Sequence, residues 1–335
     1  QAAARARNHE PSVRTRSPCS HPRRPLTARG RVHSLAASGD GQQHAARAPR
    51  GAGVRDFVAD LRSHWDQRPF VWVEDEPAHL EPGLPRRGSV LALAPHPDDP
   101  ESAAVTLGLL GRAGCQIRYA VACLSPRGVE DEYLRGSGLP SEELLTAKAA
   151  LRRQEQTRAA EAGGVEPDQV VFLGLDEEEL LEGGESEATL RALLEEAAPD
   201  LVVLPAGHDT NRTHRWVNRI FRAAAPSVAR AAGRPVVAFY NEEPKTTSMR
   251  EDLYVCFGED AAEHKGRLLR CHDSQHQRNL RTRGAGFDER ILEVNRRAAR
   301  RLASRTDARA PLTAAAGYAE AFEIEIFEHR QGVSP

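Results

Sequence analysis

The sequence contains only five cysteines among its 335 residues, and no two of them form a CxxC pair. Their number is odd and their spacing is irregular, so we expect neither a disulfide framework nor a zinc site built on thiolates. Any metal site in this chain would have to use histidine and carboxylate side chains. The cysteines are Cys19, Cys115, Cys123, Cys256 and Cys271.

The chain also lacks any apolar run close to the roughly 18 residues that a membrane-spanning helix needs. Hydrophobic residues make up 40% of the chain and charged residues 28%, a balance typical of a soluble protein with a sizeable core. The length fits one large domain or two small ones. We therefore expect no membrane span.

A strongly basic surface is absent from most of the chain. The net charge is −2 at pH 7, but residues 1–50 hold ten arginines against Glu10 and Asp40, so this segment is +8 and the rest of the chain is about −10. A folded part with this acidic balance is a poor match for the phosphate backbone of nucleic acids. We expect no nucleic-acid partner.

Residues 1–50 are rich in Arg, Ala, Ser, Gly and Pro and show almost no aliphatic periodicity. Such a segment buries too little apolar surface to offset its ordering entropy, which predicts a disordered basic segment before a single domain at residues 51–335. A basic, acid-poor segment also resembles an organelle leader, and that alternative stays open. No clearer targeting signal is present, so we expect a cytoplasmic protein.

From residue 88 onwards, apolar strands alternate with helical stretches. Strands are expected at Ser89–Ala94, Ile117–Leu124, Gln169–Leu173, Leu201–Pro205 and Pro235–Tyr240, and helices at Glu101–Ala113, Ser141–Ala162, Ala188–Ala197 and Thr213–Ala231. This alternation is typical of an α/β fold with a doubly wound, mostly parallel sheet and helices on both faces. Ligands of such a sheet bind at the carboxyl ends of its strands.

A dense polar cluster follows the first expected strand. His96, Asp98 and Asp99 lie within four residues, in the run HPDDPES, just before a helix. This spacing lets His96 and Asp99 converge on one ion while Asp98 handles a proton. The alternative is a helix N-cap, which needs one such residue and not three. The GxGxxG fingerprint of dinucleotide binding is absent here, and so is the DxT-like spacing of phosphoaspartate enzymes.

A second polar cluster, in the run HDTNRTH, follows the fourth expected strand. It contains His208, Asp209, Asn211 and His214. A third ligand from this segment would complete a His/Asp/His set around zinc and leave one position for water, as in catalytic zinc sites. The alternative is that Asp209 or Thr210 caps the next helix and that the histidines are solvated.

Together, HPDDPES and HDTNRTH, about 110 residues apart, resemble the PIG-L/LmbE-like family of metal-dependent deacetylases. The resemblance spans residues 86–327 and includes three weaker elements: RRQE at Arg152–Glu155, CHDSQ at Cys271–Gln275 and YAEAF at Tyr318–Phe322. It implies a Rossmann-like α/β sheet that binds zinc and not a nucleotide. It also implies hydrolysis of an N-acyl, usually N-acetyl, group from amino sugars or related small molecules.

By this resemblance, the metal ligands are His96, Asp99 and His214, and the general base is Asp98. The implied cofactor is Zn²⁺, and a histidine and carboxylate set also suits another divalent metal such as iron or manganese. The metal would activate a water molecule and polarise the acyl carbonyl, while Asp98 accepts the proton of that water. The expected partner is a small N-acylated substrate.

Two positions depart from the family pattern. The second motif usually reads His-Pro-Asp-His, and Asn211 stands where its first histidine would help to stabilise the oxyanion. An amide donates a hydrogen bond to an oxyanion but supplies no proton, so the leaving amine would take its proton from Asp98, His208 or His272. Residues 104–106 replace the usual Gly-Gly-Thr turn, which we interpret as a packing change.

Four further segments are weaker candidates, and the first two have two interpretations each. Arg127 and Glu130 are either pocket residues or part of a solvated loop. Arg152 either contacts the substrate or forms a surface pair with Glu155. The acidic run at residues 176–187 is interpreted as a solvated loop, and the basic run at residues 296–305 as one helix face.

Three functions fit this sequence. The first is a zinc-dependent N-deacetylase for an amino-sugar-like substrate, and the second is an amidase for a bulkier or non-sugar amide. The third is a degenerate family member that binds a ligand without turnover. The intact set of His96, Asp98, Asp99 and His214 favours an enzyme, whereas Asn211 keeps the third hypothesis open.

Overall fold

The computed structural model describes residues 52–75, 82–134, 138–178, 184–305 and 316–328. The basic segment expected at residues 1–50 lies outside these ranges and stays a prediction. In the described part of the chain, no helix combines the length and the apolar character that a membrane crossing requires.

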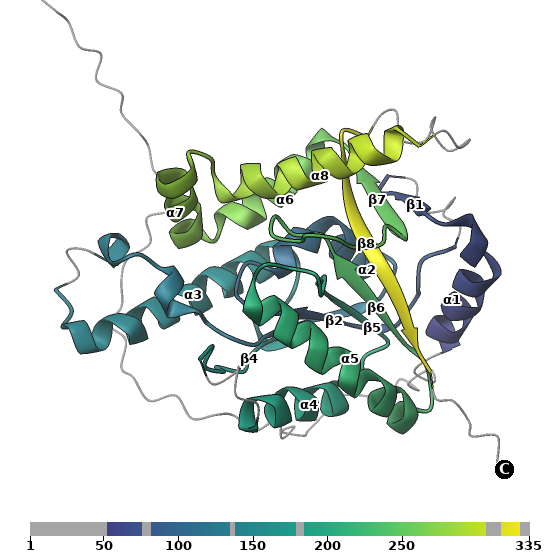
Figure 1. The fold of residues 1–335 in the computed structure, drawn as a ribbon, viewed down its shortest axis with the longest axis horizontal. Coiled ribbons are helices and arrows are strands. Elements are labelled where there is room, and N and C mark those ends of the chain that lie inside the picture. The colour runs from purple at the N-terminus through teal and green to yellow at the C-terminus, as the bar shows by residue number, and fades with distance from the viewer. Residues whose placement is uncertain (1–51, 76–81, 135–137, 179–183, 306–315, 329–335) are drawn as a thin grey trace, which may run out of the picture. The chain divides into compact units, whose positions relative to one another are not determined.

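An eight-stranded sheet forms the centre of this structure (Figure 1). Its strands are β1 (Phe70–Val73), β2 (Ser89–Ala94), β3 (Gln116–Val121), β4 (Val170–Phe172), β5 (Leu201–Pro205), β6 (Val236–Asn241), β7 (Leu253–Phe257) and β8 (Tyr318–Phe327). They lie in the order β1-β7-β8-β6-β5-β2-β3-β4, and only β8 runs antiparallel to its neighbours. The expected α/β fold with a mostly parallel sheet is confirmed.

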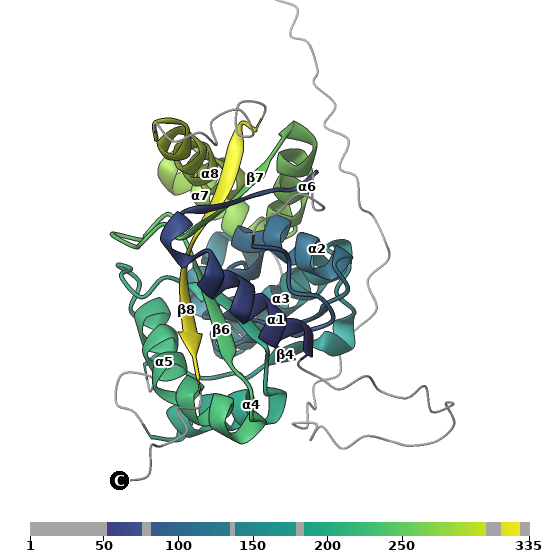
Figure 2. The same ribbon diagram turned by 90° about the vertical axis from the view of Figure 1, so that its right-hand side faces the viewer.

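Helices cover both faces of the sheet, as Figure 2 shows with α5 on one side of β6 and β8 and α1 to α3 on the other. The α-helices are α1 (Ala52–Ser63), α2 (Ala104–Arg112), α3 (Ser141–Ala162), α4 (Glu185–Ala197), α5 (Arg212–Ala232), α6 (Glu259–Arg270), α7 (Asp273–Arg283) and α8 (Phe287–Ala303). Short 3-10 helices span Trp65–Gln67, Pro100–Ala103, Pro126–Gly128, Asp131–Leu134 and Pro167–Gln169.

The alternation of side chains along β2 explains the two layers. Val90 and Ala92 pack into the cluster that includes α1 and α2, whereas Leu91 and Leu93 pack into the cluster of α4 and α5. All four are buried. A parallel strand covered by helices on both faces must be apolar throughout. This continuous apolar run is why the strand could be predicted from the sequence.

Element boundaries differ from the sequence expectations by a few residues. The expected helix Glu101–Ala113 is divided into the 3-10 turn Pro100–Ala103 and α2. The expected strand Ile117–Leu124 already ends at Val121 as β3, although the next two residues still donate backbone hydrogen bonds to the carbonyls of Ala94 and Pro95.

The sheet places the two polar clusters side by side. β2 and β5 are neighbours, with Val90 opposite Leu201. From this pair the chain continues outward in opposite directions, from β2 to β3 and from β5 to β6. This is the switch point of a doubly wound sheet, where ligands bind beyond the carboxyl ends of the strands. HPDDPES and HDTNRTH both begin at this edge.

Candidate active site

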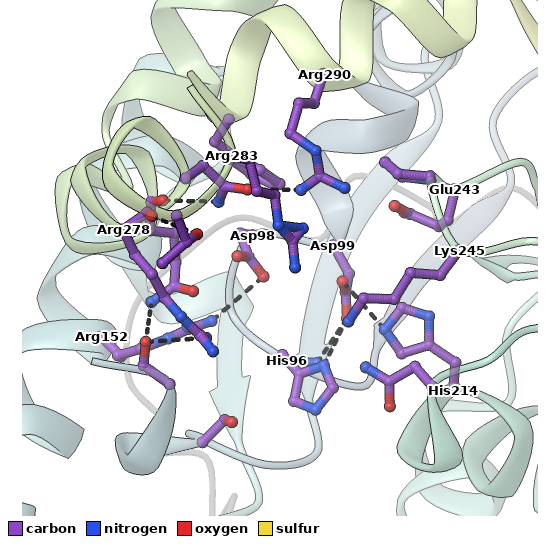
Figure 3. Close-up of a pocket in the computed structure, with 18 of the residues that line it drawn as sticks. His96, Asp98, Asp99, Arg152, His214, Glu243, Lys245, Arg278, Arg283 and Arg290 are labelled. Atoms are coloured by element: carbon purple, nitrogen blue, oxygen red, sulfur yellow. Dashed lines mark hydrogen bonds and ion pairs between the residues drawn. The ribbon is translucent and has the colours of Figure 1, made fainter. Parts of the chain in front are cut away.

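Three predicted metal ligands converge at the switch point. One nitrogen each of His96 and His214 and one carboxylate oxygen of Asp99 lie within 4.8 Å of one another. His96 and Asp99 belong to the turn after β2, and His214 belongs to the first turn of α5. In Figure 3, Asp99 lies between the two imidazoles. These donors are of the types that a divalent metal binds in proteins.

Asp209 orients His214. Its Oδ2 accepts a hydrogen bond from Nδ1 of His214 at 3.2 Å, and its side chain is fully buried. With Nδ1 engaged in this way, Nε2 of His214 faces Asp99, whose Oδ1 lies 3.5 Å away. A carboxylate on the far nitrogen of an imidazole fixes its tautomer and makes it a better metal ligand. The second motif therefore contributes both a candidate metal ligand, His214, and the carboxylate that orients it.

His96 contacts two carboxylates. Its backbone N–H donates to Oδ2 of Asp99 at 2.7 Å, its Nδ1 lies 3.4 Å from the same oxygen, and its Nε2 lies 2.7 Å from Oε1 of Glu177. Burial opposes a charge on His96, but the hydrogen bonds to Asp99 and Glu177 raise its pKa to about 9. In the absence of a metal, His96 is therefore protonated at neutral pH.

Glu177 is a site residue that sequence reasoning missed. It belongs to the acidic run that we interpreted as a solvated loop, but it lines the pocket and bonds His96. Ser125 also donates to Glu177, at 3.2 Å. The available signal was its position, because Glu177 follows β4, a parallel strand of the same sheet.

Asp98 has a strained backbone beside the ligands. Its φ is +95°, a region that costs a residue other than glycine on the order of 1–3 kcal/mol unless its surroundings hold it. Oε1 of Gln156 accepts the backbone N–H of Asp98 at 2.9 Å. Arg152 donates to the carbonyl of Pro97 and, at 3.3 Å, to Oδ1 of Asp98. Contacts from α3 thus stabilise the strained turn.

Burial raises the pKa of Asp98, although the charge of Arg152 opposes this change. A carboxyl group with a raised pKa next to possible metal ligands is suited to accept and return a proton.

The surface pair of Arg152 with Glu155, which the sequence left open, does not form. Arg152 is only 3% exposed, and Glu155 instead accepts hydrogen bonds from Ser274 at 2.7 Å.

His272 forms a buried pair behind the turn. Its Nε2 lies 3.0 Å from Oε2 of Glu101, and Glu101 accepts from Gln156 at 2.9 Å. Both members of the pair are at most 1% exposed, and neither lines the pocket. Gln156 connects this pair to Asp98, so His272 supports the site and does not reach the substrate space.

The weaker sequence elements also meet around HPDDPES. Glu320 of YAEAF is buried and accepts the backbone N–H groups of Val105 and Thr106 at 3.0 and 2.8 Å, which caps the start of α2. It also pairs with Lys265 at 2.7 Å. The packing change expected where the family has Gly-Gly-Thr is thus accompanied by a buried ion pair.

The structure brings one of the two remaining catalytic candidates to the site. Asn211 caps α5, since its Oδ1 accepts the N–H of Thr213 at 3.0 Å, and it lines the pocket with His214. His208 is exposed and does not line the pocket, and its carbonyl accepts hydrogen bonds from Thr247. Asn211 is therefore near the ligands, whereas His208 is not.

Arg127 and Glu130 lie outside the pocket that holds the ligands. Arg127 donates to Glu178 at 2.5 Å, and Glu130 forms an ion pair with Arg281. Arg152 of the RRQE run, in contrast, does line this pocket.

The pocket has a cavity volume of about 180 Å³ and is open to solvent, so a small molecule can enter it from outside. The ligands and Asp98 form one part of its lining, and α7 and α8 form another. The C-terminal helices therefore define the space in which a substrate would lie. From them come Gln275, Arg278, Asn279, Thr282, Arg283, Phe287 and Arg290.

Comparison with known sequences agrees with the motifs. Residues 91–225 match the PIG-L family model, described as GlcNAc-PI de-N-acetylase. This range includes both polar clusters and Arg152. No curated protein sequence matches the chain.

Several solved structures share the fold at low sequence identity. N,N'-diacetylchitobiose deacetylase from Pyrococcus horikoshii is 19% identical, with a TM-score of 0.52 over 71% of this chain and 84% of that chain. GalB, a 4-carboxy-2-hydroxymuconate hydratase from Pseudomonas putida, is 19% identical, with a TM-score of 0.51 over 74% and 100%. A deacetylase of teicoplanin biosynthesis is 16% identical, with a TM-score of 0.50 over 73% and 100%. At these identities the likeness establishes the fold alone.

Proposed function

We propose that this chain, whose residues 91–225 match the PIG-L family model, is a metal-dependent deacetylase that removes an N-acetyl group from a small, amino-sugar-like substrate. The observation that carries the proposal is the group of His96, Asp99 and His214, with the buried carboxyl group of Asp98 beside it. Amide hydrolysis needs ligands for a Lewis-acidic metal and a proton acceptor next to them.

The donor set fits zinc. Two imidazoles and one carboxylate are three protein ligands, the number that catalytic zinc sites combine with an open position. The hydrogen bond from His214 to Asp209 is the outer contact expected of a metal-binding imidazole. We propose zinc, or another divalent metal that accepts the same donors. When bound, this metal supplies a water molecule of lowered pKa and polarises the acyl carbonyl.

Asp98 is the proposed general base. Its carboxylate takes a proton from the attacking water and returns that proton to the leaving amine as the C–N bond breaks, which gives acetate and a free amine. The raised pKa of Asp98 favours the protonated form between these two steps. Arg152 and Gln156 keep the carboxylate in position.

We assign to Asn211 the donor for the oxyanion of the tetrahedral intermediate. Its Oδ1 is occupied by the helix cap, so its amide nitrogen is the group that can donate into the pocket. A donor of this kind contributes about 10²–10³ in kcat. Because Asn211 supplies no proton, the return of the proton rests on Asp98 in this mechanism.

A bulkier or non-sugar amide is the alternative substrate, because the pocket is open to solvent and a longer acyl group or a different amine can extend out of it. The proposal is tested by measuring acetate release from N-acetylated amino sugars and carboxylate release from longer-chain and non-sugar amides. The zinc-loaded protein is compared with chelator-treated protein, with Asp98→Asn and with Asp260→Asn, a matched change at an exposed position of α6.

We expect metal-dependent acetate release that falls by about 10²–10⁴ in Asp98→Asn while the metal stays bound. Asp260→Asn should match the unmodified protein. Turnover of only the bulkier or non-sugar amides would favour the amidase. No turnover of any amide by the metal-loaded protein would contradict the proposal and favour a family member that only binds its ligand.

A further inference from the structure

One wall of the pocket carries several positive charges. Arg278 of α7, Arg283 at the end of α7 and Arg290 of α8 line the pocket, and Lys245 lines it from the loop after β6. Figure 3 shows the three arginines extending from these helices on the side of the pocket opposite His96 and His214. We call Arg278, Arg283 and Arg290 the arginine wall.

The hydrogen bonds of the arginine wall are to neutral groups. Arg278 donates to the carbonyl of Gly128 at 3.2 Å, and Arg290 donates to Oδ1 of Asn279 at 2.6 Å. Within the described ranges, none of the three arginines forms an ion pair with a carboxylate. Their positive charges are therefore not neutralised by direct contact with the part of the protein that the structure describes.

The carboxylates that line the same pocket are all engaged by other side chains. Asp98 bonds Arg152, Asp99 contacts His96 and His214, Glu177 bonds His96, and Glu243 accepts from Asn241 at 3.0 Å. The pocket thus contains acidic groups, but the contacts of these groups go to the metal-ligand cluster and its surroundings. Glu243 acts on Arg290 only at a distance.

Other arginines of α7 and α8, outside the pocket lining, do find acidic partners. Arg281 pairs with Glu130 and Glu132, although it lies between two members of the arginine wall on the same helix. The α8 arginines outside the lining that pair with glutamates are Arg296, Arg300 and Arg301. A general excess of arginine therefore does not explain the lack of partners inside the pocket.

Clustering of these charges carries an energetic cost. Arg278 and Arg283 are exposed, whereas Arg290 is half-buried, and its burial together with the nearby charge of Arg283 lowers the pKa of Arg290. Like charges that repel one another in a partly buried site are stabilised when an anion binds between them. Guanidinium groups bind phosphate and carboxylate oxygens with paired, charge-assisted hydrogen bonds.

We propose that the arginine wall is an anion subsite, so that the substrate is an N-acylated molecule that also carries a phosphate or carboxylate group. This inference rests on the proposed function, because the metal-ligand cluster is assigned the acyl group and the arginine wall the anionic group of the same molecule. The arginine wall then selects the substrate and takes no part in proton transfer.

The test compares matched neutral and anionic substrates at constant ionic strength. The probes are N-acetylglucosamine, its 1-phosphate, its 6-phosphate, and N-acetylmuramic acid as the carboxylate form. We expect kcat/KM for at least one anionic probe to exceed the neutral value about 10-fold or more, since charged hydrogen bonds are the strong ones. Whether a phosphate or the carboxylate is preferred identifies the anion.

Two variants assign the preference to residues. In the double variant Arg283→Gln/Arg290→Gln, the ratio of anionic to neutral kcat/KM should fall to within about 2-fold of unity, if the arginine wall supplies the selectivity. Arg281→Gln removes the same charge from α7 outside the pocket and should keep the ratio. An equal loss in both variants would overturn the assignment, because it would indicate a long-range charge effect.

Binding measurements test the anion subsite independently of the proposed deacetylase activity. Titration calorimetry with Asp98→Asn measures binding of N-acetylglucosamine and its phosphates, with inorganic phosphate as a third probe. Tighter binding of the phosphates, weakened as NaCl rises from about 50 to 500 mM, would support the subsite even if no probe is hydrolysed. Equal binding and equal hydrolysis of neutral and anionic probes would overturn the subsite and leave the deacetylase intact.

Discussion

Arg152 reaches Asp98 from α3 and donates to its Oδ1 at 3.3 Å, although the two residues are 54 positions apart in the sequence. The same guanidinium bonds the carbonyl of Pro97, and Gln156 accepts the backbone N–H of Asp98. Because Asp98 has a φ of +95°, these contacts hold a conformation that the local sequence alone would not favour. Arg152 is therefore a positioning residue for the proposed base.

We predict that Arg152→Ala lowers kcat by about 10- to 100-fold, the equivalent of a lost hydrogen bond to a charged group. Metal content should stay unchanged, since Arg152 contacts no ligand atom. Arg153→Ala, which removes a guanidinium that stacks on Phe172, is the matched control on the same helix. If Arg152→Ala kept full activity, the positioning role would be wrong.

A second prediction concerns Asp209. Asp209→Asn should weaken zinc affinity by about 10- to 100-fold, because an amide NH2 group, which only donates, replaces the oxygen that accepts from Nδ1 of His214. The change retains Oδ1, which accepts the backbone N–H of Asn211 at 2.6 Å, so the loop should keep its conformation. Competition with a chromogenic chelator measures the affinity, and an unchanged value would show that His214 needs no such support.

Metal binding should depend on pH. With its pKa of about 9, His96 carries a proton at neutral pH when no metal is present, and that proton must leave before the imidazole binds a metal. The apparent dissociation constant for zinc should therefore fall about tenfold per pH unit between roughly pH 6.5 and 8. Chelator competition across this range measures the slope, and a flat profile would exclude His96 as a protonated ligand.

The two roles of Asn211 can be separated. Serine also caps helices, so Asn211→Ser should keep the cap of α5 and change stability by less than about 1 kcal/mol. It lacks the amide donor, so kcat should fall on the order of 10²-fold. Thermal unfolding and acetate release give the two readouts. Equal activity in the unmodified protein and the variant would leave Asn211 with the capping role alone.

The sequence predicted that His96, Asp99 and His214 would lie together because two independent signals coincide. β2 and β5 are apolar runs, and the polar residues directly after them belong at the carboxyl edge of a parallel sheet. The neighbouring positions of these strands then bring His96 and His214 together. Glu177 also follows a strand of the sheet, β4. It belongs to a run of acidic residues, however, and this composition favoured the interpretation as a solvated loop.

The sequence could not predict which arginines line the pocket, for a different reason. α7 reads DSQHQRNLRTR, in which Leu280 is the single apolar residue, so no hydrophobic periodicity marks it as a helix or shows which face is inward. Only the packing of α7 and α8 decides which arginines reach the pocket. In β8, likewise, the alternation of glutamates with apolar residues gave no sign that Glu320 would be buried beside Lys265.

The most direct test of the account is the metal content of the purified protein, measured by elemental analysis beside His96→Ala and His214→Ala. We predict about one zinc or other divalent ion per chain in the unmodified protein and its loss in both variants, since three protein ligands define the site. Thermal unfolding of each variant shows whether it is folded. Full metal content in either folded variant, or an unmodified protein that neither holds nor takes up a divalent metal, would contradict the account.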